Sequence, residues 1–130
     1  MAIQRQTDRA TLAGRRILVI EDEFFLADDI ARAVRALGGE VVGPASDAEE
    51  GMALVTSEGG IDAALLDINL HDEMAYPIAS ALRARAIPFA FSTGYDQQAI
   101  PAEFHDVRHF EKPFDPKSVA SALSQLMDRP

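Results

Sequence analysis

The chain of 130 residues contains no cysteine, which excludes disulfide bonds, thiolate metal sites and cysteine nucleophiles. Lysine is nearly absent as well, since it occurs only as Lys112 and Lys117. Acidic residues outnumber basic ones by 21 to 12, and the net charge of -9 argues against nucleic acid as a direct partner. No apolar run approaches the roughly 18 residues of a membrane span, and the start of the chain lacks the apolar stretch of a signal peptide. We therefore expect a cytoplasmic protein without a membrane or nucleic-acid partner.

Five apolar runs of strand type alternate with helical patterns, at residues 16–20, 40–43, 62–66, 88–92 and about 107–110. This alternation predicts one α/β domain whose parallel sheet is covered by helices on both faces. Right-handed crossovers leave few topologies, and polar groups after the first and third strands favour placing these two strands side by side. This placement favours the order 2-1-3-4-5 of known doubly wound folds, which we adopt in predicting a doubly wound five-stranded sheet. The domain is expected to span residues 15–130, after a disordered lead of residues 1–14, with no output domain attached.

Helix-start signals are clear for the second, third and last predicted helices and weak in the fourth crossover. Ser46 followed by Glu49 predicts a capping box at the start of the second helix. Pro77 fits the first turn of the third helix, and Asp115 before Pro116 fits the start of the last. By contrast, Pro101 limits any helix between the fourth and fifth strands to about one turn. The fourth crossover is therefore expected to be the least regular.

Carboxylates follow the first and third predicted strands. Asp67 ends the third strand, where it is either a turn-capping residue or a phosphoryl acceptor, a role that a carboxylate can perform. Glu21 and Asp22 follow the first strand, and adjacent carboxylates raise each other's pKa unless a cation lies between them. Mg²⁺ prefers one or two carboxylates together with water and phosphate oxygens. The pattern therefore indicates a site for Mg²⁺, or for Mn²⁺, at this edge of the sheet.

Two further polar islands follow the fourth and fifth strands. Thr93 offers a hydroxyl to a phosphoryl oxygen, and Gly94 leaves room beside it, although a glycine alone is typical of a turn. Lys112 supplies an ammonium group that would offset negative charge on Asp67 and on a phosphoryl group. The peptide bond before Pro113 is a candidate for the cis form, which would direct the lysine into the crevice. Because the carboxyl ends of parallel strands meet in one crevice, we expect these groups to converge.

The motifs VIEDE, LLDINL, FSTGY and EKPF, in this order and spacing, make residues 15–127 resemble the receiver domains of bacterial two-component response regulators. The resemblance implies a flavodoxin-like receiver fold with Asp67 as the phosphoacceptor. The phosphoryl donor would be a histidine kinase or a histidine phosphotransfer protein. FSTGY resembles the F-A-T-G-Y motif of a single-domain subgroup that is associated with phosphorelay and stress signalling. Such a domain would be a switch rather than a turnover enzyme, with slow self-dephosphorylation only.

The resemblance also implies roles for the residues around Asp67. Glu21 and Asp22 would be the acidic pair, with Asp22 the direct Mg²⁺ ligand, and Asn69 would offer its backbone carbonyl to the metal. Thr93 would be the switch hydroxyl and Lys112 the phosphate-binding lysine, with Gly94 beside the phosphoryl group.

Three features depart from the receiver pattern. His109 stands where receivers usually carry an aromatic residue, three positions before the lysine. The segment from His71 to Met74 replaces a common Pro-x-Met-Asp-Gly loop, and Pro101 shortens the fourth helix. We expect Tyr95 and His109 to modulate the site, and signalling to use a rearrangement of residues 95–103. The three histidines are spaced unlike a metal site and are interpreted as loop and strand-end residues.

Two other functions compete with this interpretation. A Mg²⁺-dependent phosphohydrolase with Asp67 as nucleophile is one, but Asn69 stands where such enzymes usually place a second aspartate as general acid. The other is a degenerate receiver that acts as a constitutive interaction module, which the lost aromatic residue keeps open. The sequence does not name the downstream protein partner.

Overall fold

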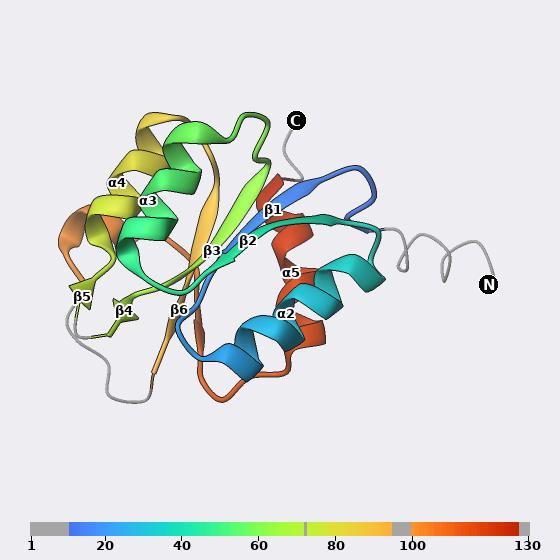
Figure 1. Ribbon diagram of the computed structural model, residues 1–130. Helices are drawn as coiled ribbons and strands as arrows, with labels where there is room; N and C mark the ends of the chain where they lie inside the picture. Colours follow the sequence, from blue (N-terminus) through green and yellow to red (C-terminus); the bar gives the residue numbers. More distant parts are fainter. Residues whose placement is uncertain (1–10, 72, 95–99, 128–130) are drawn as a thin grey trace.

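The structure is a computed structural model that describes residues 11–71, 73–94 and 100–127 (Figure 1). Its main sheet has five parallel strands in the order β2-β1-β3-β6-β7. They are β1 (Arg16–Ile20), β2 (Glu40–Ala45), β3 (Ala63–Asp67), β6 (Phe89–Thr93) and β7 (His109–Glu111). Counted along the chain, this is the predicted order 2-1-3-4-5, and the flavodoxin-like fold class is confirmed. A second, antiparallel pair of short strands, β4 (Asn69–Leu70) and β5 (Glu73–Met74), was not predicted.

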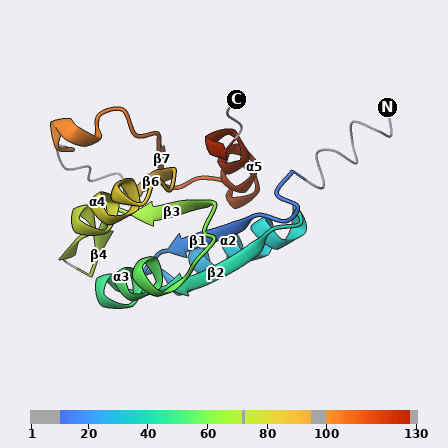
Figure 2. The same ribbon diagram turned by 90° about the horizontal axis from the view of Figure 1, so that it is seen from above.

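Helices cover both faces of the sheet (Figures 1 and 2). One face carries α2 (Phe24–Ala36) and α5 (Pro116–Met127), and the other carries α3 (Ala48–Ser57) and α4 (Tyr76–Ala84). Between β6 and β7 the described part of the chain has only the short 3-10 helix η1 (Ala102–Phe104), in agreement with the limit predicted from Pro101. None of the helices among the described residues is long and apolar enough to cross a membrane.

The strands divide the core into two layers by their alternation. In β1, Leu18 and Ile20 pack toward α3 and α4, whereas Ile17 and Val19 pack toward α2 and α5. All five residues of β3 are buried, as expected for a central parallel strand covered on both faces. β1 and β3 pair in parallel, so the polar residues that follow these strands leave the sheet at the same edge.

Two boundaries differ from the sequence predictions. The backbone N–H of Leu12 donates to the carbonyl of Leu37 at 2.9 Å, and its side chain is fully buried. The packed domain therefore begins before residue 15, while residues 1–10 of the predicted lead lie outside the described residues. The cap of α3 is Asp47, which accepts from the Glu50 N–H at 2.8 Å, not Ser46. Because β2 extends to Ala45 instead of ending at residue 43, the helix begins further along the chain than predicted.

Candidate functional site

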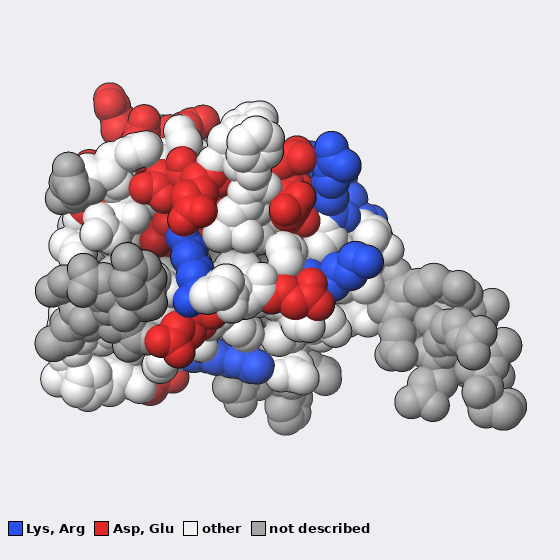
Figure 3. All heavy atoms as spheres, turned by 90° about the horizontal axis from the view of Figure 1, so that it is seen from below, with Lys and Arg blue, Asp and Glu red and all other residues white. Residues whose placement is uncertain are grey.

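The carboxyl ends of β1, β3, β6 and β7 bring the predicted polar islands to one edge of the sheet. Asp67 and Thr93 are the last residues of β3 and β6, and Lys112 directly follows β7. The Lys112 N–H donates to the Thr93 carbonyl at 2.7 Å, which ties the last two islands together. A pocket of about 630 Å³ opens here. Viewed from below, the molecule shows a patch of acidic side chains next to a basic side chain (Figure 3).

Three carboxylates form the centre of this site. Glu21, Asp22 and Asp67 each place one oxygen atom within 4.8 Å of the others. Glu21 is 2% exposed and Asp67 is 3% exposed, and Oε1 of Glu21 has no hydrogen-bond partner among the described residues. Carboxylates at such short range repel one another unless a cation lies between them. An all-oxygen donor set with an unpartnered buried oxygen fits a hard divalent cation such as Mg²⁺.

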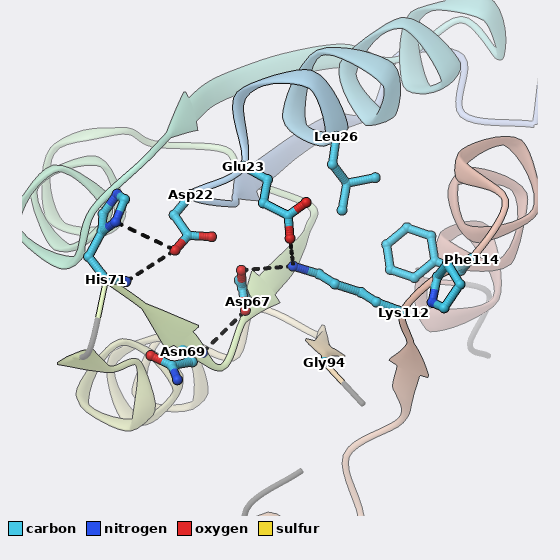
Figure 4. Close-up of a pocket in the computed structure, with 10 residues that line it drawn as sticks. Asp22, Glu23, Leu26, Asp67, Asn69, His71, Gly94, Lys112 and Phe114 are labelled. Atoms are coloured by element: carbon cyan, nitrogen blue, oxygen red, sulfur yellow. Dashed lines mark hydrogen bonds and ion pairs between the residues drawn. The ribbon is translucent and has the colours of Figure 1, made fainter. Parts of the chain in front are cut away.

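Lys112 points its ammonium group into the carboxylates (Figure 4). Its Nζ lies 2.9 Å from Oε2 of Glu21, 3.1 Å from Oδ2 of Asp67 and 3.3 Å from Oε2 of Glu23. The peptide bond between Lys112 and Pro113 is cis. Burial alone would lower the pKa of Lys112, but its hydrogen bond to Glu21 and the charges of Asp67 and Glu21 outweigh burial and raise it. Lys112 therefore stays charged across the physiological range.

Burial and the close approach of the carboxyl groups shift their pKa values from the ordinary range. Burial, followed by the charge of Glu21, raises the pKa of Asp67 to about 8, and Lys112 offsets only part of this. Burial also raises the pKa of Glu21. Asp22 behaves differently: burial would raise its pKa, but hydrogen bonds, first among them the one from the backbone N–H of His71, lower it. One ammonium group therefore does not balance the negative charge of the cluster.

The other predicted site residues differ in whether the structure places them at the pocket. The backbone N–H of Asn69 donates to Oδ1 of Asp67 at 3.2 Å, and Gly94 lines the pocket. Thr93 is 3% exposed at the end of β6. Tyr95 lies outside the described residues. His109 is exposed on β7, so the structure does not bring it to the pocket.

Two contacts of the site were missed by the sequence analysis. Glu23 was not assigned to the site, yet it shares the Lys112 ammonium group. His71 was interpreted as a loop residue, yet its backbone N–H donates to Oδ2 of Asp22 at 3.1 Å. No sequence signal predicts either contact, because each contact joins residues from separate crossover segments.

Known proteins resemble the chain in sequence and in fold. No family model matches it. The phyllosphere-induced regulator PhyR of Methylorubrum extorquens is 29% identical over 114 residues, which cover 85% of this chain and 43% of PhyR. The chain spans less than two thirds of the length of the curated relatives that it matches.

Two solved structures give the likeness in three dimensions. The solution structure of SdrG from Sphingomonas melonis Fr1 has a TM-score of 0.76 and 37% identity, covering 90% of this chain and 98% of SdrG. The crystal structure of the receiver domain of the hybrid histidine kinase CckA has a TM-score of 0.71 and 28% identity, covering 87% of this chain and 99% of that domain. The chain belongs to the receiver domains of response regulators, the phosphoacceptor modules of two-component signalling.

Proposed function

We propose that Asp67 accepts a phosphoryl group from a phosphorylated histidine of a kinase or a phosphotransfer protein, in a reaction that requires Mg²⁺ or Mn²⁺. The observation that carries this proposal is the position of Asp67. Its carboxylate ends a central strand at the floor of an open pocket, within 3.1 Å of the Lys112 ammonium group. A nucleophile with a positive group beside it and space in front of it is what phosphoryl transfer requires. Residues 15–130, extended by the packed Leu12, would form the receiver.

Each side chain would contribute one function to the transfer. An Asp67 oxygen would form the new O–P bond while the N–P bond of the donor phosphohistidine breaks, leaving the electron pair on the histidine nitrogen. Lys112 would form an ion pair with one oxygen of the transferred phosphoryl group, and the Thr93 hydroxyl would donate a hydrogen bond to another phosphoryl oxygen. Asp22, Asp67, Glu21 and the Asn69 carbonyl would hold the cation. When bound, Mg²⁺ would offset charge on the phosphoryl oxygens.

The phosphorylated domain would act on another protein or pass the group along a phosphorelay. Charge at Asp67 changes from a paired carboxylate to a more strongly charged phosphoryl group, which alters what Lys112 and Thr93 bind. A turnover phosphohydrolase is not favoured, because the residue two positions after Asp67 is Asn69 and an amide is no general acid.

The test is the mass of the intact protein after incubation with acetyl phosphate and Mg²⁺. Wild type should gain a single phosphoryl group that is labile to base, and the gain should vanish in EDTA and in Asp67→Asn. Asp29→Asn, which changes an exposed carboxylate of α2, should behave as wild type. A phosphorylated histidine phosphotransfer protein serves as a second donor. Failure of wild type with both donors, or phosphorylation of Asp67→Asn, would overturn the proposal.

A further inference from the structure

We infer that His71 is a positioning residue for Asp22, and that the affinity of the site for a divalent cation depends on the backbone N–H of His71 in the turn between β4 and β5. This inference rests on the proposed cation site and adds a part to it. Only Ile68 and β4 separate the turn from the end of β3, so one short segment carries Asp67 at one end and His71, which contacts Asp22, at the other.

Two contacts join His71 to the same oxygen of Asp22 (Figure 4). The backbone N–H donates to Oδ2 at 3.1 Å, and the ring Nδ1 lies 3.7 Å from that oxygen. Only the first distance is that of a hydrogen bond. The ring is 65% exposed, so water competes for its longer contact, whereas the Asp22 side chain is 19% exposed. The N–H, more than the imidazole, therefore holds the carboxylate.

The turn is built to aim that N–H. His71 has a φ of 49°, and it shares the left-handed region with only one other non-glycine residue in the described ranges, Ala86. Residues other than glycine rarely adopt this backbone conformation without a compensating interaction. The hairpin is anchored on both sides, since Leu70 and Ala75 are buried and the Ala75 N–H donates to the Ile68 carbonyl at 2.7 Å. With both strands anchored, the left-handed conformation of His71 directs its N–H toward Asp22.

The consequence for a cation follows from how carboxylates bind metals. A donor on one oxygen fixes the rotation of the carboxylate and leaves the other oxygen for the cation. Partners of this kind behind a metal ligand commonly change metal affinity by 10- to 100-fold when they are removed. Linkage makes the effect reciprocal: a cation held by Asp22 must stabilise the hairpin by the same factor. Asp22 approaches the site from the β1–α2 loop, where the structure shows no other backbone donor to its Oδ2 among the described residues.

Substitutions at residue 71 separate the backbone from the ring. His71→Gly keeps the N–H and tolerates a positive φ, so its Mg²⁺ dissociation constant should stay within about 3-fold of wild type. His71→Pro removes the N–H, and we expect Mg²⁺ binding to weaken about 10- to 100-fold. Ala86→Pro is the matched control, because Ala86 also has a positive φ and a bonded N–H but lies just before β6, at the other end of the sheet. It should lower stability without changing Mg²⁺ affinity.

The measurement is a calorimetric Mg²⁺ titration of the full chain, with circular dichroism to verify folding. Equal affinity of wild type and folded His71→Pro, or a loss in His71→Gly as large as that in His71→Pro, would overturn the inference. A second measurement does not depend on a proline variant. The His71 amide of wild type should be protected from hydrogen exchange, and Asp22→Ala should remove this protection; an unprotected amide also counts against the inference. Wild type that fails to bind Mg²⁺ would instead contradict the proposed function.

Discussion

The ammonium nitrogen of Lys112 lies 3.1 Å from Oδ2 of Asp67, although 45 residues separate them in sequence. The same nitrogen contacts Glu21 and Glu23, and it is the only positive group among these carboxylates in the described part of the chain. One positive charge thus faces four carboxylates, including Asp22, of which two are buried. This imbalance means that protons, Mg²⁺ and Lys112 should all compete for the same oxygen atoms, and each competition can be measured.

The first expectation concerns pH and the stability of the metal-free protein. The pKa of Asp67 is raised from 3.8 to about 8, so the folded protein holds a proton that the unfolded chain releases near pH 4. The stabilisation from this proton is present at low pH and is lost as the pH rises through about 8. In EDTA, we expect deprotonation of Asp67 to lower the free energy of unfolding by on the order of 2 kcal/mol between pH 5 and pH 9.

Urea unfolding at a series of pH values measures this effect. Asp67→Asn should show a shallower pH dependence and, above pH 8, a higher stability than wild type. Saturating Mg²⁺ should flatten the wild-type curve, because the cation replaces the proton. Parallel curves for wild type and Asp67→Asn in EDTA would contradict the expectation.

Lys112→Ala should have opposite effects on stability and on cation binding. Removing the ammonium group leaves buried carboxylates without a partner, which should destabilise the metal-free protein by about 3 kcal/mol at pH 8. The same change removes a positive charge that repels the cation, so Mg²⁺ should bind about 10-fold more tightly. Lys117→Ala, at the other lysine of the chain, changes an exposed residue of α5 and should change neither quantity. Weaker Mg²⁺ binding by Lys112→Ala would mean that the lysine chiefly orders the carboxylates.

Thr93→Ala should weaken the binding of a phosphoryl mimic without preventing metal binding. A hydroxyl that donates to a charged oxygen contributes about 1.5–3 kcal/mol, so the affinity for beryllium fluoride in the presence of Mg²⁺ should fall by roughly 10- to 100-fold. Thr93→Ser keeps the hydroxyl and should stay close to wild type. Fluorine NMR of the bound species measures both variants, and equal occupancy of wild type and Thr93→Ala at limiting beryllium fluoride would argue against the role.

The strands were predictable from the sequence because their signals are local: apolar runs bounded by Gly, Pro and acidic residues mark them. Crossover handedness only narrowed the possible orders, and the order 2-1-3-4-5 was adopted from known doubly wound folds. The meeting of Asp22, Asp67 and Lys112 followed from the same logic, since the ends of parallel strands share an edge.

The remaining details depend on contacts that no local pattern encodes. His71 and Asp22 are 49 residues apart, and Glu23 and Lys112 are 89 apart, so their contacts depend on loop paths and side-chain rotamers. The β4–β5 hairpin was not predicted because each of its strands has two residues, which are too few to reveal the alternation of apolar and polar residues in a strand. Leu12 was assigned to a disordered lead because a single apolar residue in a polar segment has no periodicity.

Tyr76 provides a last prediction, on the packing behind the site. Its hydroxyl is buried without a hydrogen-bond partner among residues 11–71, 73–94 and 100–127, while its ring stacks on Phe104 with centroids 5.7 Å apart and meets the edge of Phe91. Tyr76→Phe keeps these ring contacts and removes the unpaired group, so the free energy of unfolding should rise by about 1 kcal/mol. Tyr76→Leu loses the aromatic contacts and should lower it by about 2 kcal/mol. Urea unfolding distinguishes these outcomes, and a loss of stability in Tyr76→Phe would show that the hydroxyl is hydrogen-bonded in solution. Because Tyr76 packs in the core layer of α3 and α4 and does not line the pocket, phosphorylation of Asp67 should proceed normally in Tyr76→Phe.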